Sequence, residues 1–257
     1  MFKRKKEKSQ YSEIERIKNN SQDNDMLSST IMFDFSIIFK IAIGLLIIFV
    51  LIHLYKDGDG FVKVSKEYEY VESLKNIKKP KHNPETGGTT IVVDGENIEV
   101  TYLASVDISG RVSIMQKCFE HNLQNKISPI DLIISWGDLA KNKNSNLVNW
   151  SEAGERGYQY YISAEAMQEN PQLINIVKSS HAHLSLVPAN KEIKSLIKMI
   201  KQDDYIRMEG FVVSLNCEKK NGGTFRWHSG YSKSNFAGGK SKLFLVTKIV
   251  WLEANGS

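Results

Sequence analysis

One long apolar run, residues 31–55, constrains this 257-residue chain more than any other feature. Its middle part, Ile41 to Ile52, has no polar side chain, and the flanking apolar residues extend it to the ~20 residues that cross a bilayer core as a helix. A long polar segment precedes the run and no small-residue cleavage site follows it, unlike a cleaved signal peptide. A buried core helix is an alternative, although such helices rarely stay apolar on every face. The run therefore predicts a transmembrane helix, with Asp34 and Lys40 near its interfacial start.

The distribution of basic residues gives the orientation of this helix only a slight bias. Seven Lys or Arg residues precede the run and seven follow it before residue 82. The dense basic start at residues 3–6 is typical of a cytoplasmic N-terminus. We therefore expect a single-pass protein whose larger C-terminal part lies outside the cytoplasm.

Composition divides the rest of the chain into three parts. Residues 1–30 are polar and charged, so we expect a disordered tail there. Residues 56–90 collect prolines, glycines and lysines without an apolar pattern, which is typical of a stalk or linker. Residues 91–257 are enough for one globular domain. From Glu99 onward the chain has 19 Lys and Arg against 15 Asp and Glu, a surplus too small to favour nucleic acid as a partner.

Local patterns in residues 91–257 predict both strands and helices. Asp94-Gly95, between two β-branched runs, predicts a hairpin at 91–100, and Gly110 is expected to mark a bulge. Asn190 is a favourable N-cap for a helix at 190–200. A second helix is predicted at 171–179, and further strands at 101–115, 126–136, 158–162, 181–187, 205–215, 224–229 and 243–252.

These elements indicate an α+β fold. Several short strands with internal glycines, interrupted by two or three helices, favour a small curved sheet or a partly open β-barrel analogous to the oligonucleotide/oligosaccharide-binding (OB) fold. The two cysteines, Cys118 and Cys217, form no metal-binding pattern. Their spacing leaves open whether they pair in an oxidising compartment or are two buried free thiols.

Four residues are candidates for a binding site. His181 and His183 stand two apart in a predicted strand, so their imidazoles share one face. With a carboxylate such as Asp131 they could perform acid–base chemistry, although the position of Asp131 favours a role in a turn. Trp227 and His228 are the other two candidates. No third ligand stands at a diagnostic spacing, so we expect no metal and no cofactor.

Several short blocks between residues 106 and 252 resemble a known family. They include Asp107 to Val112, Trp136-Gly137, Val187-Pro188-Ala189 and Glu209 to Val212. These blocks resemble those of an uncharacterised family of single-pass, membrane-anchored bacterial proteins. The resemblance implies the bacterial inner membrane as location and the anchored architecture; it implies no activity. Members of the family often carry a Cys-Glu pair before the last strand, where this chain has Gly-Lys-Ser-Lys at 239–242.

The functional expectation follows from the tether and from the lack of residues at catalytic spacing. We expect a membrane-tethered protein-interaction or assembly module of a bacterial envelope complex, with a protein partner or a second copy of the chain. One alternative is a membrane-bound hydrolase that uses the histidine pair with a carboxylate. The other is a cytoplasm-facing binder of nucleic acid or a phage component.

Overall fold

The computed structural model describes residues 39–40, 43–48, 64–119, 121–232, 236–238 and 240–254. The chain divides into two units, Met1–Phe61 and Val62–Ser257. In the first unit, residues 39–40 and 43–48 are helical. The rest of the predicted span at 31–55 and the predicted tail at 1–30 lie outside the described residues. Over the described ranges, no helix combines the length and the apolar character needed to cross a bilayer.

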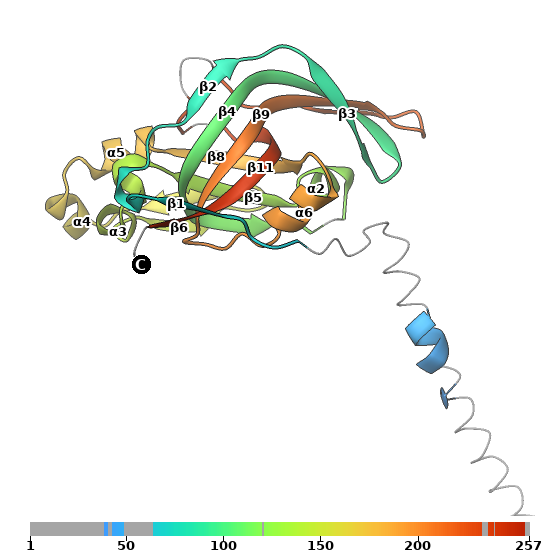
Figure 1. Ribbon diagram of the computed structural model, residues 1–257, viewed down its shortest axis with the longest axis horizontal. Helices are drawn as coiled ribbons and strands as arrows, with labels where there is room; N and C mark the ends of the chain where they lie inside the picture. The colour runs from blue at the N-terminus through green and yellow to red at the C-terminus, as the bar shows by residue number, and fades with distance from the viewer. Residues whose placement is uncertain are drawn as a thin grey trace, which may run out of the picture. The chain divides into compact units, whose positions relative to one another are not determined.

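The second unit has the predicted α+β architecture, with one mixed sheet, a separate hairpin and short helices (Figure 1). The hairpin consists of β6 (Asn149–Glu152) and β7 (Tyr158–Tyr161). Over the described part of residues 64–254 the sheet has nine strands. They are β1 (Tyr68–Val71), β2 (Lys81–Pro84), β3 (Gly88–Val93), β4 (Glu96–Lys117), β5 (Ile130–Ser135), β8 (His181–Pro188), β9 (Tyr205–Glu218), β10 (Thr224–Trp227) and β11 (Lys242–Ala254).

Short helices connect the strands, and they outnumber the two or three predicted. The predicted N-cap Asn190 is confirmed, because its side chain accepts a hydrogen bond from the backbone of Ile193. The helices missed by the prediction span only one or two turns, too few for a helical period to appear. The helices are α2 (Leu123–Ile127), α3 (Asn142–Ser145), α4 (Ala164–Glu169), α5 (Leu173–Ser179) and α6 (Lys191–Ile197), with 3-10 turns η1 (Leu74–Asn76) and η2 (Gly137–Ala140).

Five strands of the sheet form a closed ring of pairings. β4 pairs antiparallel with β5 and β9, and β5 pairs antiparallel with β8. β8 pairs parallel with β11, which returns to β9 in antiparallel orientation. The long strands β4 and β9, of 22 and 14 residues, run side by side and curve along their length (Figure 1). Because β4 is so long, it also pairs with β2 and β3 along other parts of its edges.

Two glycines allow strands of the ring to approach closely. A Cβ added at Gly210 of β9 would lie 2.0 Å from the carbonyl oxygen of Leu245, and one at Gly110 of β4 would lie 2.4 Å from that of Ser135. The predicted bulge at Gly110 is wrong, because the register between β4 and β5 shifts between Val112 and Ile114. Gly110 serves close packing of the two strands instead.

The predicted hairpin at Asp94-Gly95 is confirmed. β3 and β4 pair antiparallel on either side of it, and both turn residues have positive φ, 56° and 76°. A type I′ turn requires this geometry.

The sheet begins earlier in the chain than residue 91. β1 pairs parallel with β11, and β2 pairs antiparallel with β4. The stalk expected at 56–90 therefore does not hold for residues 68–84. Each of these edge strands has only four residues, too few to show a clear alternation of apolar and polar side chains, so the composition around them is that of a linker.

The two faces of β5 and β8 have different surroundings. Leu132 and Ile134 of β5 and Leu184 and Leu186 of β8 are fully buried in the main apolar core, which also includes residues of α6. Each such side chain contributes roughly 1.5–3 kcal/mol to folding. The opposite face carries polar residues at alternate positions, and the β6–β7 hairpin packs over it. These residues are Asp131, Ser135, His181, His183 and Ser185.

Of the two states left open for the cysteines, the structure has the unpaired one. Cys118 and Cys217 are both free and buried. Burial raises the pKa of the Cys118 thiol to about 11. At neutral pH this thiol is therefore protonated and a poor nucleophile.

Candidate functional site

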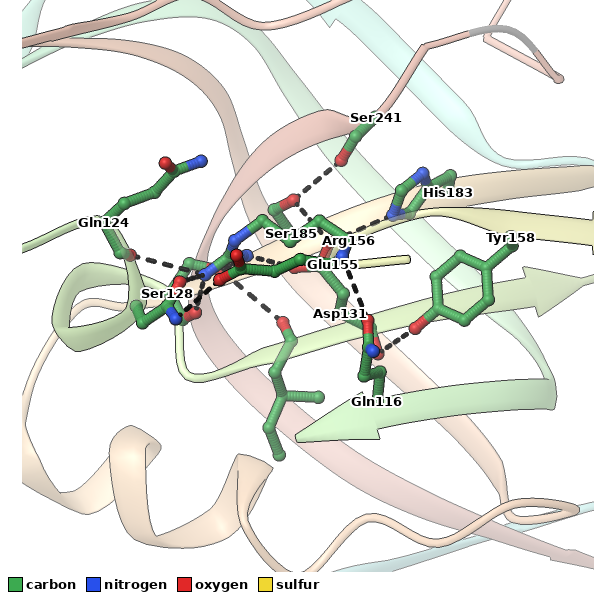
Figure 2. A network of polar contacts seen from close by, with 12 residues as sticks. Gln116, Gln124, Ser128, Asp131, Glu155, Arg156, Tyr158, His183, Ser185 and Ser241 are labelled. Carbon is green, nitrogen blue, oxygen red and sulfur yellow. Dashed lines mark hydrogen bonds and ion pairs between the residues drawn. The ribbon is translucent and has the colours of Figure 1, made fainter. Parts of the chain in front are cut away.

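A buried carboxylate, Asp131 of β5, is the centre of a polar cluster on the outer face of β5 and β8 (Figure 2). Its side chain has no exposed surface. Oδ1 accepts a hydrogen bond from Arg156 Nη1 at 2.5 Å, and Oδ2 accepts from His183 Nε2 and Ser185 Oγ, each at 3.1 Å. These three donors replace the water that the carboxylate lost on burial.

Arg156 reaches this cluster from the turn between β6 and β7. Its φ of 56° lies in the left-handed region, which residues other than glycine seldom occupy. The guanidinium also donates to the backbone oxygen of Ser128 at 2.5 Å and to Asn125 Oδ1 at 2.9 Å. The ring centroid of Trp227 lies 4.9 Å from Cζ, in a cation–π contact. One buried cation thus connects the hairpin to β5, α2 and β10.

Two serines extend the cluster but do not form a catalytic triad. Ser185 Oγ donates its hydrogen bond to Asp131. In the contact of 2.7 Å between the two serine hydroxyls, Ser241 Oγ is therefore the donor and Ser185 Oγ the acceptor. Ser185 is fully buried. Asp131 lies between Ser185 and His183, whereas a nucleophilic triad requires the imidazole in the middle. Ser185 is therefore not arranged as a nucleophile.

A cavity of about 360 Å³ lies beside the cluster. The hairpin contributes the rings of Trp150, Tyr158 and Tyr160 to its walls, and β8 contributes the imidazoles of His181 and His183. Tyr158 meets His183 edge-on with centroids 4.9 Å apart, and Trp150 meets His181 with centroids 5.2 Å apart. The prediction that the two histidines share one face is confirmed.

His181 is neutral at pH 7. Burial lowers its pKa, and the nearby Lys242 and His183 lower it further, against a raising effect of its hydrogen bond to Val177. Nδ1 donates to the backbone oxygen of Val177 at 2.5 Å. The neutral ring therefore has Nε2 as a hydrogen-bond acceptor.

Lys242 supports the loop that completes the cavity wall. Its Nζ donates to the backbone oxygens of Gly238 at 2.8 Å and Lys240 at 3.3 Å, and lies 5.5 Å from the ring centroid of Phe236. Gly238 lines the cavity. Lys242 is 1% exposed, and burial lowers its pKa to about 8.

Three of the four predicted binding residues lie in or beside this arrangement. His181 and His183 line the cavity, and Trp227 packs on the guanidinium of Arg156. His228 is exposed just beyond β10 and is not among the residues that line the cavity.

The role of Asp131 was misread from the sequence. Its assignment to a turn is wrong, since it lies within β5 and is fully buried. A single carboxylate inside the apolar run 130–134 was the available signal, because a buried charge requires partners. Arg156, in a glycine-flanked turn, and Trp150 offered no comparable signal.

Two further searches, for metal-binding groups of side chains among the described residues and for known relatives, gave no result. Within the described ranges, no three His, Cys, Asp or Glu side chains group closely enough to hold a metal ion. Comparisons of the chain with protein-family models, curated proteins and solved structures gave no match.

We expect Asp131→Asn to lower the free energy of unfolding by about 3–5 kcal/mol, because it leaves the Arg156 charge buried and uncompensated. Denaturant titration of the full chain in detergent, followed by near-UV circular dichroism, measures this. Asp138→Asn is the matched control: Asp138 is 60% exposed in its ion pair with Lys141, so the loss should stay below about 1 kcal/mol. Equal losses in the two variants would contradict the central role of Asp131.

We expect Lys242→Met to raise the free energy of unfolding at pH 7 by about 1–3 kcal/mol, because it removes a buried charge. The lysine pKa is about 8 in the fold against a reference value of 10.5. Below pH 8, Lys242 is protonated in both the folded and the unfolded state, and the full cost of burying its charge lowers the free energy of unfolding. Between these values the unfolded state binds more protons, so the wild type gains stability as pH rises. The advantage of the variant should therefore shrink from pH 8 to pH 10.5, and a constant advantage would refute this explanation.

Proposed function

We propose that this chain is a membrane-tethered protein-interaction module of a bacterial envelope complex, and that its aromatic cavity receives a side chain of the partner. The observation that carries the proposal is the cavity itself, in which Trp150, Tyr158 and Tyr160 stand opposite two imidazoles. Aromatic rings with polar edges provide much of the contact energy in protein interfaces. The buried ion pair holds these rings in place before binding, which lowers the entropic cost of association.

The tether is part of the proposal. The apolar run at 31–55 supports it, as do the exposed apolar side chains on the helical residues within that run, such as Phe39, Leu45 and Leu46. A lipid environment would cover such side chains. Tethering at an inner membrane raises the local concentration of the domain near membrane-bound partners.

We also propose that the five-stranded ring is a partly open barrel of the OB type. In chain order the ring strands are β4 (first), β5 (second), β8 (third), β9 (fourth) and β11 (fifth). Around the ring their order is β4, β5, β8, β11, β9, and β9 pairs again with β4. The parallel pair joins the third and fifth strands, and α6 connects the third to the fourth. Such barrels bind ligands on the face of the second and third strands. Here those strands are β5 and β8, which contribute to the cavity; this analogy supports the site and not the ligand.

One contact favours a second candidate function, a membrane-bound hydrolase. His183 Nε2 donates to Asp131 at 3.1 Å, and a carboxylate-oriented imidazole is the arrangement of a general base. A hydrolase predicts that His183→Gln, which can still donate to Asp131, lowers turnover of p-nitrophenyl acetate by roughly 100-fold. Equal rates for the variant and the wild type would remove this candidate.

Thiol labelling in intact cells tests the side of the membrane. We expect a membrane-impermeant maleimide to label Gln168→Cys, on the exposed surface of α4, and not Ser9→Cys in the predicted cytoplasmic tail. The native cysteines are buried and should react only after denaturation. The opposite pattern would place the domain in the cytoplasm, contradict the envelope proposal, and favour a binder of nucleic acid or a phage component.

Photo-crosslinking in the same cells tests the interaction. We expect p-benzoylphenylalanine at Tyr160, in the cavity wall, to give a discrete adduct with a second polypeptide. The matched position is Val92, which is 69% exposed on β3 and outside the cavity. Absence of an adduct at Tyr160, or the same adducts at both positions, would contradict binding through the cavity.

A further inference from the structure

The wall of the aromatic cavity carries a lysine and no carboxylate. Among the described residues that line this cavity, none is Asp or Glu, and Lys178, in the last turn of α5, is the one Lys or Arg. Asp131 of the neighbouring cluster is already compensated by Arg156. Within the part of the chain that the structure describes, Lys178 is exposed and forms no ion pair. The charge of Lys178 is therefore available to a ligand.

A second cation, Lys242, lies behind the same wall. Its Nζ donates to the backbone oxygen of Gly238, a residue of the wall, at 2.8 Å. Its charge reaches the cavity, because it contributes to the lowered pKa of His181. Burial alone lowers the pKa of Lys242 itself, so no carboxylate among the described residues offsets the cost of burying it. Lys242 is thus a buried cation held by carbonyl oxygens and an aromatic ring, without a counter-ion there.

The cost of this arrangement points to a ligand. A buried charge without a counter-ion destabilises a fold, and such charges are common at functional sites. A negative charge in the cavity would offset part of this cost, because water and salt screen interactions with a buried charge only weakly. With Lys178 in the wall and Lys242 behind it, the cavity favours an anion.

The rings of the wall indicate which anion fits. Trp150, Tyr158 and Tyr160 offer apolar surface to a hydrocarbon stem. A phosphate has no such stem and is usually bound by arginine or by several backbone N–H groups. The N–H of Gly238 in this wall already donates to the backbone oxygen of His181 at 2.7 Å. A carboxylate beside His181 also favours the protonated imidazole, which adds a further cation.

We propose that the residue received by the aromatic cavity carries a carboxylate, held by Lys178 in the wall and by the buried charge of Lys242 behind it. This inference rests on the proposed function, since it names the group that the partner inserts. An acidic side chain and a C-terminal carboxylate offer the same chemistry. The experiment separates these two sources, and a phosphate is its competing outcome.

Saturation-transfer NMR of the full chain in phosphocholine nanodiscs tests the proposal with three acetylated tripeptides at millimolar concentration. Amidated Ala-Glu-Ala presents an acidic side chain, Ala-Ala-Ala with a free C-terminus presents the other carboxylate, and amidated Ala-Gln-Ala is the neutral control. We expect one carboxylate peptide to bind about tenfold more tightly than the neutral one, which also identifies the source. Equal binding of the neutral peptide, no transfer to either carboxylate peptide, or displacement by equimolar phosphate would overturn the proposal.

Variants locate the carboxylate in the molecule. Lys242→Met should weaken binding of the preferred peptide roughly tenfold. Because this variant is expected to be more stable than the wild type, a folding defect cannot explain the loss. Lys178→Gln should weaken binding about fivefold. Lys248→Gln, at an exposed lysine of β11 outside the cavity, is the matched control and should bind as the wild type does. Wild-type affinity in Lys242→Met or in Lys178→Gln would refute the assignment.

The crosslink at Tyr160 distinguishes failure of this inference from failure of the proposed function. If p-benzoylphenylalanine at Tyr160 captures a second polypeptide while neither carboxylate peptide binds, the interaction stands and the carboxylate is wrong. If no adduct forms and no peptide binds, both proposals are wrong.

Discussion

The buried ion pair between Asp131 and Arg156 is the interaction on which the rest of the site depends. Among the residues that the structure describes, the β6–β7 hairpin forms no strand pairing with the main sheet, so its position is set by side chains. Arg156 supplies the central contact, and Tyr158 adds a hydrogen bond from its hydroxyl to the backbone oxygen of Asp131 at 2.8 Å. A buried charge tolerates few alternative positions, because any other arrangement leaves it unpaired. The rings that the hairpin carries, including Trp150, are therefore placed by this pair.

The site combines compensated ion pairs with two lysines, Lys178 in the cavity wall and the buried Lys242 beside it. Asp131 and Arg156 compensate each other, as do Arg111 of β4 and Asp203. His181 is neutral because burial and nearby cations lower its pKa. The two lysines therefore leave this face with a small positive surplus. Recognition there combines this charge, which acts at long range, with shape, aromatic contact and hydrogen-bond pattern, which act at close range.

Local chemistry explains what could be predicted from the sequence and what could not. The Asp94-Gly95 turn, the α6 helix with its Asn190 cap and the alternating strands each depend on neighbouring residues, and the structure has them. Asp131 and Arg156 are 25 residues apart, and Asp131 and His183 are 52 apart. No local sequence pattern predicts such contacts. The strand β2 was missed because its pairing with β4, rather than its own composition, makes it a strand.

The pairing of β1 with β11 has a consequence for how the chain is made. Tyr68 lies opposite Trp251, and β11 also pairs with β8 and β9. The final strand therefore completes three strand pairings at once. Until it has left the ribosome, the earlier strands have unpaired edges that favour aggregation. Since contacts so distant in sequence form slowly, the nascent domain keeps these edges exposed until β11 has emerged and paired.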